Sequence, residues 1–138
     1  MTLILDAGVL FAQANASDPE HERVASLLQA ESGSLATSQF AFAEADYLIL
    51  ERLGVDAELA FLDDLAAGTF VAECLDREEL SSARDLARRY RDLELGVADA
   101  SLLVLAARYR TVRIATLDRT DFLAVRPLHG EALELLPE

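Results

Sequence analysis

Residues 95–118, LGVADASLLVLAARYRTVRIATLD, decide the fold class of this 138-residue chain. Residues 100–107 are apolar around most of a helix, so other elements must cover that helix on most sides. Residues 112–116 are short and rich in β-branched side chains, which predicts a buried strand directly after the helix. A buried helix joined to a buried strand is typical of an α/β fold with a parallel sheet.

An acid lies near the start of this helix and another after this strand. Asp99 falls in the first helical turn, where the helix dipole favours a carboxylate, but its apolar neighbours offer no counter-charge. Asp118 follows the strand, at the carboxyl end where open α/β sheets bind their ligands. Two acids in such positions suggest a metal site.

Length and composition predict one globular domain over residues 1–138. The chain is 52% hydrophobic and 27% charged, which favours a packed core over disorder. Cys74 is the only cysteine, so no internal disulfide is possible, and the first residues do not resemble a secretion signal. These features predict a cytoplasmic protein without a membrane-spanning segment.

Charge is distributed unevenly along the chain, whose formal net charge is −13. Residues 1–76 hold two arginines and fourteen acids, whereas residues 77–138 hold ten arginines and eleven acids. An acidic protein normally repels nucleic acid, but its arginine-bearing half can bind a polyanion if metal ions neutralise the acidic pocket. Lysine is absent, which disfavours any mechanism that needs a lysine.

Strand and helix patterns alternate along the rest of the chain, which predicts a mainly parallel sheet of about five strands flanked by helices. Strands are expected at residues 3–5, 35–37, 69–74, 112–116 and 131–136. Helices are expected at residues 8–14, 19–31, 39–52, 56–67, 77–90 and 100–107, with one further turn at 121–124.

Polar residues and glycines mark the ends of these helices. The expected N-caps are Ser17 or Asp18 before Pro19, Ser38, Asp56, and Asp76 in a capping box with Glu79. The expected C-terminal stops are Gly33, Gly54 and Gly68.

Two further acids lie in apolar surroundings. Glu44 is in the middle of the helix at 39–52, and the residues three and four positions away from it are all apolar. We expect Glu44 to be buried, so its carboxylate must be protonated, paired or bound to a metal. Asp6, directly after the strand at 3–5, poses the same problem.

Asp6, Glu44, Asp99 and Asp118 therefore come from four elements and are expected near one end of one sheet. Clustered carboxylates repel one another, and hard divalent cations with oxygen ligands relieve that repulsion. Mg²⁺ or Mn²⁺ is the natural ion, because the chain has no cysteine cluster and only two histidines.

Each of these residues also has an ordinary structural interpretation. An acid at a strand end is often only a helix N-cap, which applies to Asp6 and Asp118, and Asp99 can be simply a favourable first-turn charge. Asp46, two positions from Glu44, points away from it and is more simply structural or interfacial. The remaining candidates are expected to be ordinary residues: a surface His21, a turn residue His129 and a buried, small apolar Cys74.

Four motifs carry a resemblance to a known family. ILDAGVL at 4–10, FAEADYL at 42–48, LGVADASLL at 95–103 and IATLDRTDF at 114–122 resemble the acidic blocks of the PIN-domain ribonucleases. Their order and spacing, over nearly the whole chain, resemble the VapC toxins of bacterial toxin–antitoxin pairs. The resemblance implies the three-layer PIN-like α/β fold.

The resemblance also implies roles for individual residues. Asp6, Glu44, Asp99 and Asp118 match the family's metal-binding acids, and Asp121 matches a position that is frequently acidic. Thr116 matches a threonine that can orient a metal-bound water. The chain departs from the pattern at Ala7 and Gly8, where many members carry a serine or threonine, so that hydroxyl is missing here.

The activity implied is Mg²⁺- or Mn²⁺-dependent hydrolysis of RNA phosphodiester bonds by an endoribonuclease toxin. Single-stranded or looped RNA is the expected substrate. Arg119 and Arg126 flank the last acidic block and are candidates for phosphate contacts, with ordinary solvated charges as the alternative.

The resemblance implies two partners, a cognate antitoxin and a second copy of the chain in a homodimer. The apolar side chains of Val9, Leu10, Phe11, Phe40, Phe42 and Tyr47 fit such interfaces and would equally fit the core.

Other function classes remain to be weighed. A phosphoacceptor receiver domain needs a lysine, and a haloacid-dehalogenase-type phosphatase needs Asp-x-Asp where this chain has Asp6 and Gly8. The serious alternative is a non-catalytic PIN-like module that binds RNA or a protein.

Overall fold

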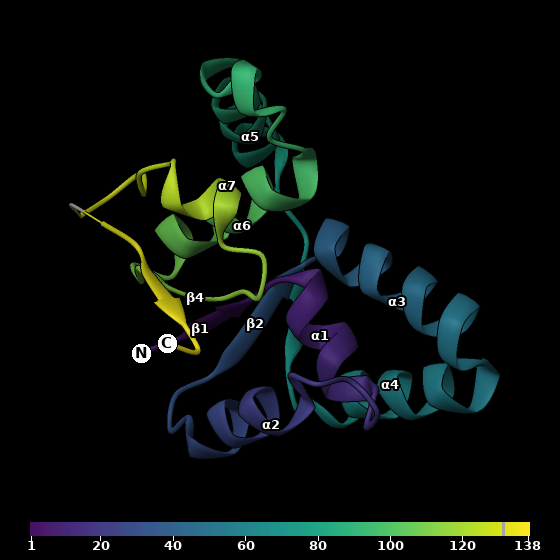
Figure 1. Cartoon of the computed structure of the whole chain (residues 1–138). Coiled ribbons are helices and arrows are strands. Elements are labelled where there is room, and N and C mark those ends of the chain that lie inside the picture. Colours follow the sequence, from purple (N-terminus) through teal and green to yellow (C-terminus); the bar gives the residue numbers. More distant parts are fainter. Residues whose placement is uncertain (131) are drawn as a thin grey trace.

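A five-stranded sheet runs through the centre of the computed structural model, which describes residues 1–130 and 132–138 (Figure 1). Its strands are β1 (Leu3–Leu5), β2 (Leu35–Ser38), β3 (Val71–Glu73), β4 (Arg113–Ala115) and β5 (Glu134–Leu136). They pair in the order β3-β2-β1-β4-β5, and every pairing is parallel. The expected α/β class is confirmed, and the sheet is parallel throughout its described strands.

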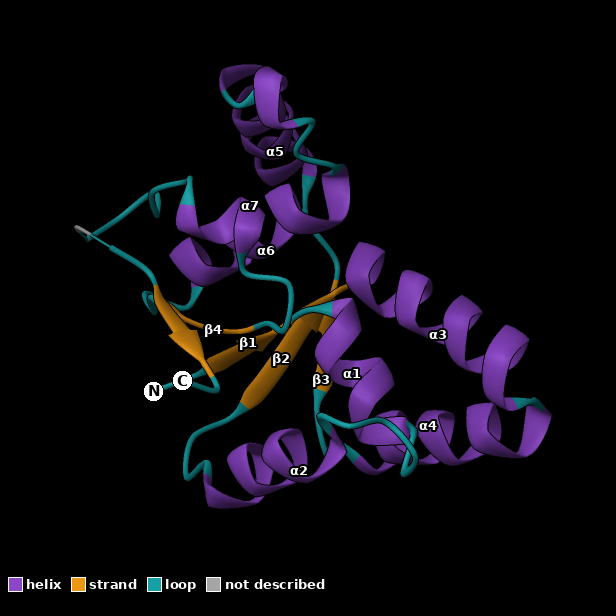
Figure 2. Cartoon of the chain, in the orientation of Figure 1, coloured by secondary structure: helices purple, strands orange, loops and turns teal. Residues whose placement is uncertain are grey.

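Helices cover both faces of this sheet (Figure 2). They are α1 (Ala7–Ala14), α2 (His21–Ala30), α3 (Gln39–Leu53), α4 (Val55–Ala67), α5 (Arg77–Arg89), α6 (Val97–Arg108) and α7 (Thr120–Leu123), with a 3₁₀ turn η1 (Arg91–Leu93). α6 packs on β1 and β2, and α5 packs on α6. α3 contacts both α1 and α6, so it joins the two helical layers at one edge of the sheet.

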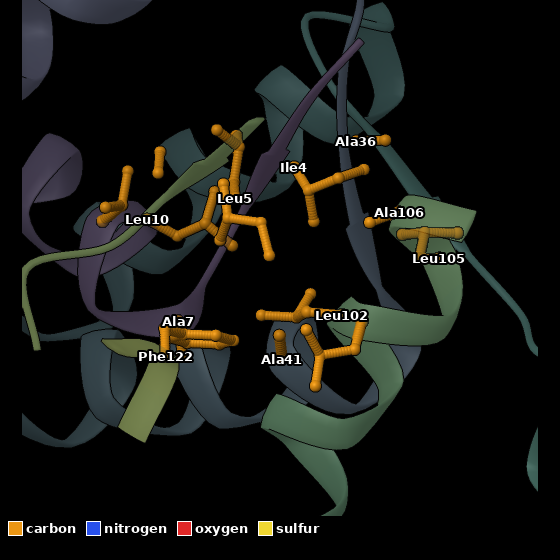
Figure 3. Close-up of a cluster of buried hydrophobic side chains, with 14 of the residues drawn as sticks. Ile4, Leu5, Ala7, Leu10, Ala36, Ala41, Leu102, Leu105, Ala106 and Phe122 are labelled. Atoms are coloured by element: carbon orange, nitrogen blue, oxygen red, sulfur yellow. The ribbon is translucent and has the colours of Figure 1, made fainter. Parts of the chain in front are cut away.

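The central strand β1 is buried on both faces, as expected for a parallel sheet between two helical layers. Successive side chains of a strand point to opposite faces, so Ile4 and Leu5 belong to different layers of the core. Leu5 borders an apolar cleft against α1, α2 and α4. Figure 3 shows Ile4 in the buried cluster that also contains Leu102, Leu105 and Ala106 of α6.

The strand order creates a crevice at the carboxyl end of β1. From β1 the chain runs outward to β2 and β3, then returns to place β4 on the other side of β1. Asp6 leaves β1 at this point, and its backbone N–H donates to the carbonyl of Ala115 in β4 at 3.1 Å. Ligands of open α/β sheets bind where the strand order reverses in this way.

Most helix ends follow from local chemistry. Ser38 caps α3 by accepting from the N–H of Ala41, and Asp76 forms the expected capping box with Glu79. α4 ends at Gly68, which takes the left-handed conformation (φ +77°) that glycine adopts without strain.

Two expected caps are wrong. α2 begins at His21 and not near Pro19, because the Asp18 carboxylate accepts from the N–H of Glu20 and closes a separate turn before the helix. Gly54 takes the N-cap position of α4. Asp56 lies inside the first turn, where the helix dipole still stabilises its carboxylate.

Edge position explains the other differences. β3 is shorter than the expected strand at 69–74, and Cys74 is exposed and not buried as expected, because β3 has only one neighbouring strand. The expected strand at 131–136 is confirmed as Glu134–Leu136, while residue 131 lies outside the described residues. Within the part of the chain that the structure describes, no helix has the length and apolar character needed to cross a bilayer.

Candidate metal centre

A cleft of about 330 Å³ opens at the carboxyl ends of β1 and β4. Its lining residues are Asp6, Ala7, Gly8, Ala41, Glu44, Gly96, Ala98, Asp99, Leu102, Leu117 and Asp118. All four acids of the expected set line this one cleft, although they come from the end of β1, from α3, from α6 and from the segment after β4. No basic side chain is among these lining residues, so the cleft is strongly acidic.

Asp6 is the most buried of the four, with 7% of its surface exposed. Its carboxylate caps α1 by accepting from the N–H of Val9 at 2.8 Å, so the structural interpretation as an N-cap is correct as well. The pKa of Asp6 is raised to about 6: burial is the largest cause, and the charges of Glu44 and Asp118 add to it, while hydrogen bonds from Thr116 and Val9 lower it.

Asp99 lies in the first turn of α6, as expected, and is half-buried. Burial is the largest cause that raises its pKa to about 6, followed by the nearby charges of Asp6, Asp121, Glu44 and Asp118. Asp99 is therefore near enough to the other acids to be repelled by them.

Glu44 is exposed, and the expectation that it is buried was wrong. The buried side of α3 consists of Ala41, Ala45 and Ile49, whereas neighbouring apolar residues such as Tyr47, at 63% exposure, face outward. The apolar character of α3 therefore did not indicate burial at position 44. The Glu44 side chain lies at the cleft with freedom to change rotamer.

Asp118 lines the cleft, whereas Thr116, two residues earlier, is not among the lining residues. Asp118 is exposed, and its Oδ1 accepts from the N–H of Thr120 at 3.3 Å, while Arg119 occupies the N-cap position of α7. Thr116 is buried, and its hydroxyl lies 2.9 Å from the carbonyl oxygen of Asp118 and within hydrogen-bonding reach of the Asp6 carboxylate. Because the hydroxyl has one hydrogen, it serves one of these acceptors at a time.

A buried serine pair connects the two helices that carry Glu44 and Asp99. Ser38 Oγ accepts from the N–H of Ala41 and lies 2.6 Å from Ser101 Oγ, which donates to the carbonyl of Ala98 at 2.6 Å. Both serines are fully buried. Sequence reasoning found Ser38 as a cap but missed Ser101, whose only signal is a lone hydroxyl in an apolar run.

The remaining candidates lie outside the cleft lining. Asp121 is near enough to raise the pKa of Asp99. His21 Nδ1 lies 2.8 Å from the carbonyl oxygen of Ala12, so this ring nitrogen is used in a hydrogen bond within the fold. The Arg119 guanidinium donates to the carbonyl of Pro137 at 3.3 Å, and Arg126 is exposed.

The cleft offers the donor chemistry of a hard divalent cation, namely several carboxylates without a competing base. Among residues 1–130 and 132–138, no three acid, histidine or cysteine side chains lie close enough to share one ion as positioned. Rotation of the exposed Glu44 and Asp118 side chains is needed to bring their oxygens together. The residues fit such an ion by chemistry and placement in one cleft, with side-chain rearrangement.

A second cleft, of about 370 Å³ and mainly apolar, lies apart from the acidic cleft. It runs between α1, α2 and α4, and Leu10, Leu28 and Phe61 are among its lining residues. The apolar residues noted in the sequence divide accordingly: Val9 and Leu10 are core, Phe42 stacks on Phe61 with ring centres 5.1 Å apart, and Tyr47 is exposed.

Comparison with known proteins agrees with this geometry. The sequence model of the PIN domain matches residues 3–126. Ribonuclease VapC26 of Mycobacterium tuberculosis is 39% identical over 135 residues, which cover 98% of this chain and 100% of that protein.

Three solved structures share the fold. VapC20 of Mycobacterium tuberculosis, a toxin that cleaves the Sarcin-Ricin loop, has a TM-score of 0.75 at 19% identity over 81% of this chain and 86% of its own. VapBC2 of Rickettsia felis, bound to a promoter DNA fragment, has a TM-score of 0.71 at 17% identity over 99% and 100%. FitAcB of Neisseria gonorrhoeae has a TM-score of 0.63 at 20% identity over 93% and 99%. With its fold, its sequence match over most of its length and its full-length relative, the chain belongs to the PIN domain family.

Proposed function

We propose that this protein is a metal-dependent endoribonuclease and the toxin of a toxin–antitoxin pair. The observation that carries the proposal is the acidic cleft, in which carboxylates from four elements meet without a basic partner. The full-length similarity to a ribonuclease VapC26 supports RNA as the substrate.

In this proposal Asp6, Glu44, Asp99 and Asp118 hold Mg²⁺ or Mn²⁺, and Asp121 assists from α7. When bound, such a cation supplies Lewis acidity, which activates water and offsets the charge of the phosphodiester. Asp6 is buried and held in place by the Val9 N–H, so it is the fixed ligand, while the exposed Glu44 and Asp118 are free to move inward. Thr116 has a second role in orienting the attacking water.

The phosphodiester bond is cleaved by addition of water to phosphorus and departure of one ester oxygen. No lysine exists in the chain, and no nucleophilic serine or cysteine lines the cleft. The chain therefore contributes carboxylates that bind and position, and the departing oxygen takes its proton from solvent.

Arg126 is the better of the two expected phosphate contacts, because the Arg119 guanidinium is already engaged by Pro137. The position of the cleft at the carboxyl ends of β1 and β4 suits single-stranded or looped RNA, whose phosphates are accessible. We place this activity in the cytoplasm, within one domain that spans the chain.

The apolar cleft between α1, α2 and α4 is a suitable binding site for an antitoxin segment. Toxin–antitoxin complexes among the structural neighbours support such a partner. A different surface suits a homodimer: Tyr47 and Leu50 of α3 and Val55 and Leu59 of α4 are each more than 40% exposed.

An RNA cleavage assay tests the proposal. Purified protein should cut single-stranded RNA with Mg²⁺ or Mn²⁺, and EDTA should stop the reaction. Glu44→Gln should reduce the rate at least a hundredfold with no loss of thermal stability, because Glu44 is exposed and makes no hydrogen bond within the described residues. Glu51→Gln, also exposed on α3, is the matched control.

Among the described residues, no three possible ligands are already grouped around one point, and this favours one alternative, a PIN domain that binds RNA without cutting it. Wild-type protein that binds RNA but leaves it intact with either metal would establish this alternative.

A further inference from the structure

The ten arginines of the second half of the chain differ in their partners. Arg84 pairs with the exposed Asp85, and Arg119 donates to the carbonyl of Pro137. Arg77 and Arg110 are exposed, with no carboxylate partner among the described residues. Arg108 and Arg113 pair with buried or half-buried carboxylates. Arg88 and Arg89 in the last turn of α5, Arg91 in η1 and Arg126 after α7 are exposed, and none has a carboxylate partner among the described residues.

Tyr90 links the two segments that carry these four arginines. It follows α5 as its C-cap, between Arg89 and Arg91, and its hydroxyl accepts from the backbone N–H of Arg126 at 3.2 Å. The segment after α7 is thereby held against the end of α5, although the two are 36 positions apart in the sequence. The result is a surface made of two segments, in which these four arginines outnumber the exposed acids Asp92 and Glu94.

This surface borders the acidic cleft. Gly96 lines the cleft and is five positions after Arg91, so their Cα atoms are at most about 18 Å apart. On the other segment, Asp121 is five positions before Arg126 and near enough to raise the pKa of Asp99 in the cleft. In Figure 1, α7 lies between α5 and the strands that carry the cleft.

Helix dipole effects explain only part of this arrangement. Arg88 and Arg89 are favoured at the C-terminal end of α5, but Arg126 lies in a loop, two positions beyond the C-cap of the four-residue α7. A protein with a net charge of −13 and an acidic active cleft repels RNA over most of its surface, so a separate basic surface is needed to hold the strand.

We propose that Arg88, Arg89, Arg91 and Arg126 form a phosphate-binding track that holds single-stranded RNA to one side of the cleft. This inference rests on the proposed ribonuclease function and names the surface that binds the substrate. The track contacts phosphates and not bases, so it positions the strand without reading its sequence.

Salt-dependent binding tests the track without relying on cleavage. In an Asp6→Asn background, a fluorescein-labelled single-stranded RNA is titrated by anisotropy from 50 to 300 mM KCl. Each phosphate contact contributes about 0.7 to the slope of log K against log salt, so Arg91→Gln with Arg126→Gln should lower the slope by about 1.4. Binding at 0.1 M salt should weaken roughly tenfold.

The control is Arg77→Gln with Arg84→Gln, which removes the same formal charge from the start and the middle of α5. This pair should change the slope by much less than the first. Melting temperatures of both double variants check that each is folded.

The results separate the two proposals. Equal slopes for the track variant and the control would overturn the track, and so would a track variant that loses only binding to a protein partner. If wild-type protein binds RNA through the track but never cuts it, the ribonuclease proposal fails while the track stands. If cleavage continues with unchanged KM in the track variant, the track fails while the ribonuclease proposal stands.

Discussion

At the scale of single residues, Asp6 has two roles that oppose each other. It caps α1 and so stabilises the fold, yet it is a buried acid among other acids, with a pKa raised to about 6. This repulsion favours cation binding. Carboxylates that destabilise the metal-free protein by repelling one another gain the most stability when a cation binds between them.

Asp6→Asn should therefore stabilise the metal-free protein while abolishing activity. Asparagine keeps the N-cap and removes the charge, and the gain should be about 1–3 kcal/mol at pH 8. The folded pKa is about 6 and the ordinary value is 3.8, so the stability of wild type falls as pH rises from about 4 to 6 and then levels off.

Urea denaturation in EDTA at pH 4 to 8 measures this effect. The difference in unfolding free energy between variant and wild type should grow from about pH 4 to about pH 6 and stay constant from there to pH 8. A difference that is independent of pH would show that Asp6 ionises normally.

Ser101 is a positioning residue. Ser101→Ala removes the hydroxyl that Ser38 donates to and leaves that buried donor unpaired, which should cost about 1–3 kcal/mol. The bond joins the helices of Glu44 and Asp99, so we expect weaker Mn²⁺ binding as well. Ser101→Thr, which restores the hydroxyl, should recover metal affinity; if it does not, or if Ser101→Ala binds Mn²⁺ normally, the positioning role is wrong.

At the scale of elements, one side chain fastens α5 to the rest of the fold. Arg108 at the end of α6 donates to Glu79 of α5, to Glu73 of β3 and to the carbonyl of Cys74, at 2.6 to 2.9 Å. Tyr109 donates to the same Glu73 at 2.8 Å. These bonds hold the end of β3 and the start of α5 in place, and the proposed basic track lies at the other end of α5.

Arg108→Lys should lower stability by about 1–2 kcal/mol, since a lysine cannot reproduce the several guanidinium bonds and the site is partly exposed. Arg84→Lys, at a solvent-exposed pair with Asp85, should have little effect. Guanidinium unfolding of the two variants compares them, and equal stability would mean that the Arg108 bonds contribute nothing net.

Elements were predictable from sequence where the signal was local. The cap at Ser38, the capping box at Asp76 and the stop at Gly68 depend on a few adjacent residues, and all three are confirmed. Asp18 was a wrong N-cap because its carboxylate accepts from the N–H of Glu20 and closes a separate turn, and Asp56 because Gly54, two positions earlier, takes the N-cap position of α4.

At the scale of the whole molecule, the topology accounts for the acidic cleft. The order β3-β2-β1-β4-β5 places the ends of β1 and β4 side by side, so Asp6 and Asp118 meet although they are far apart in the sequence. The placement of Asp6 and Asp118 was predictable because strand ends of a parallel sheet share an edge, whereas Glu44 and Asp99 lie on helices and reach the cleft through the packing of α3 and α6.

The exposure of Glu44 and the basic surface around Tyr90 were not predictable. Both depend on which helix faces remain uncovered and on a contact between segments 36 positions apart. Periodicity shows that a helix has an apolar side, but tertiary packing decides how much of that side is covered.

The claim that four carboxylates form one metal centre is tested most directly by Mn²⁺ titration calorimetry on folded protein. Wild type should bind Mn²⁺, and Asp6→Asn, Glu44→Gln, Asp99→Asn and Asp118→Asn should each weaken binding at least tenfold, while Asp46→Asn should not. Unchanged Mn²⁺ affinity in the four variants would contradict a shared centre.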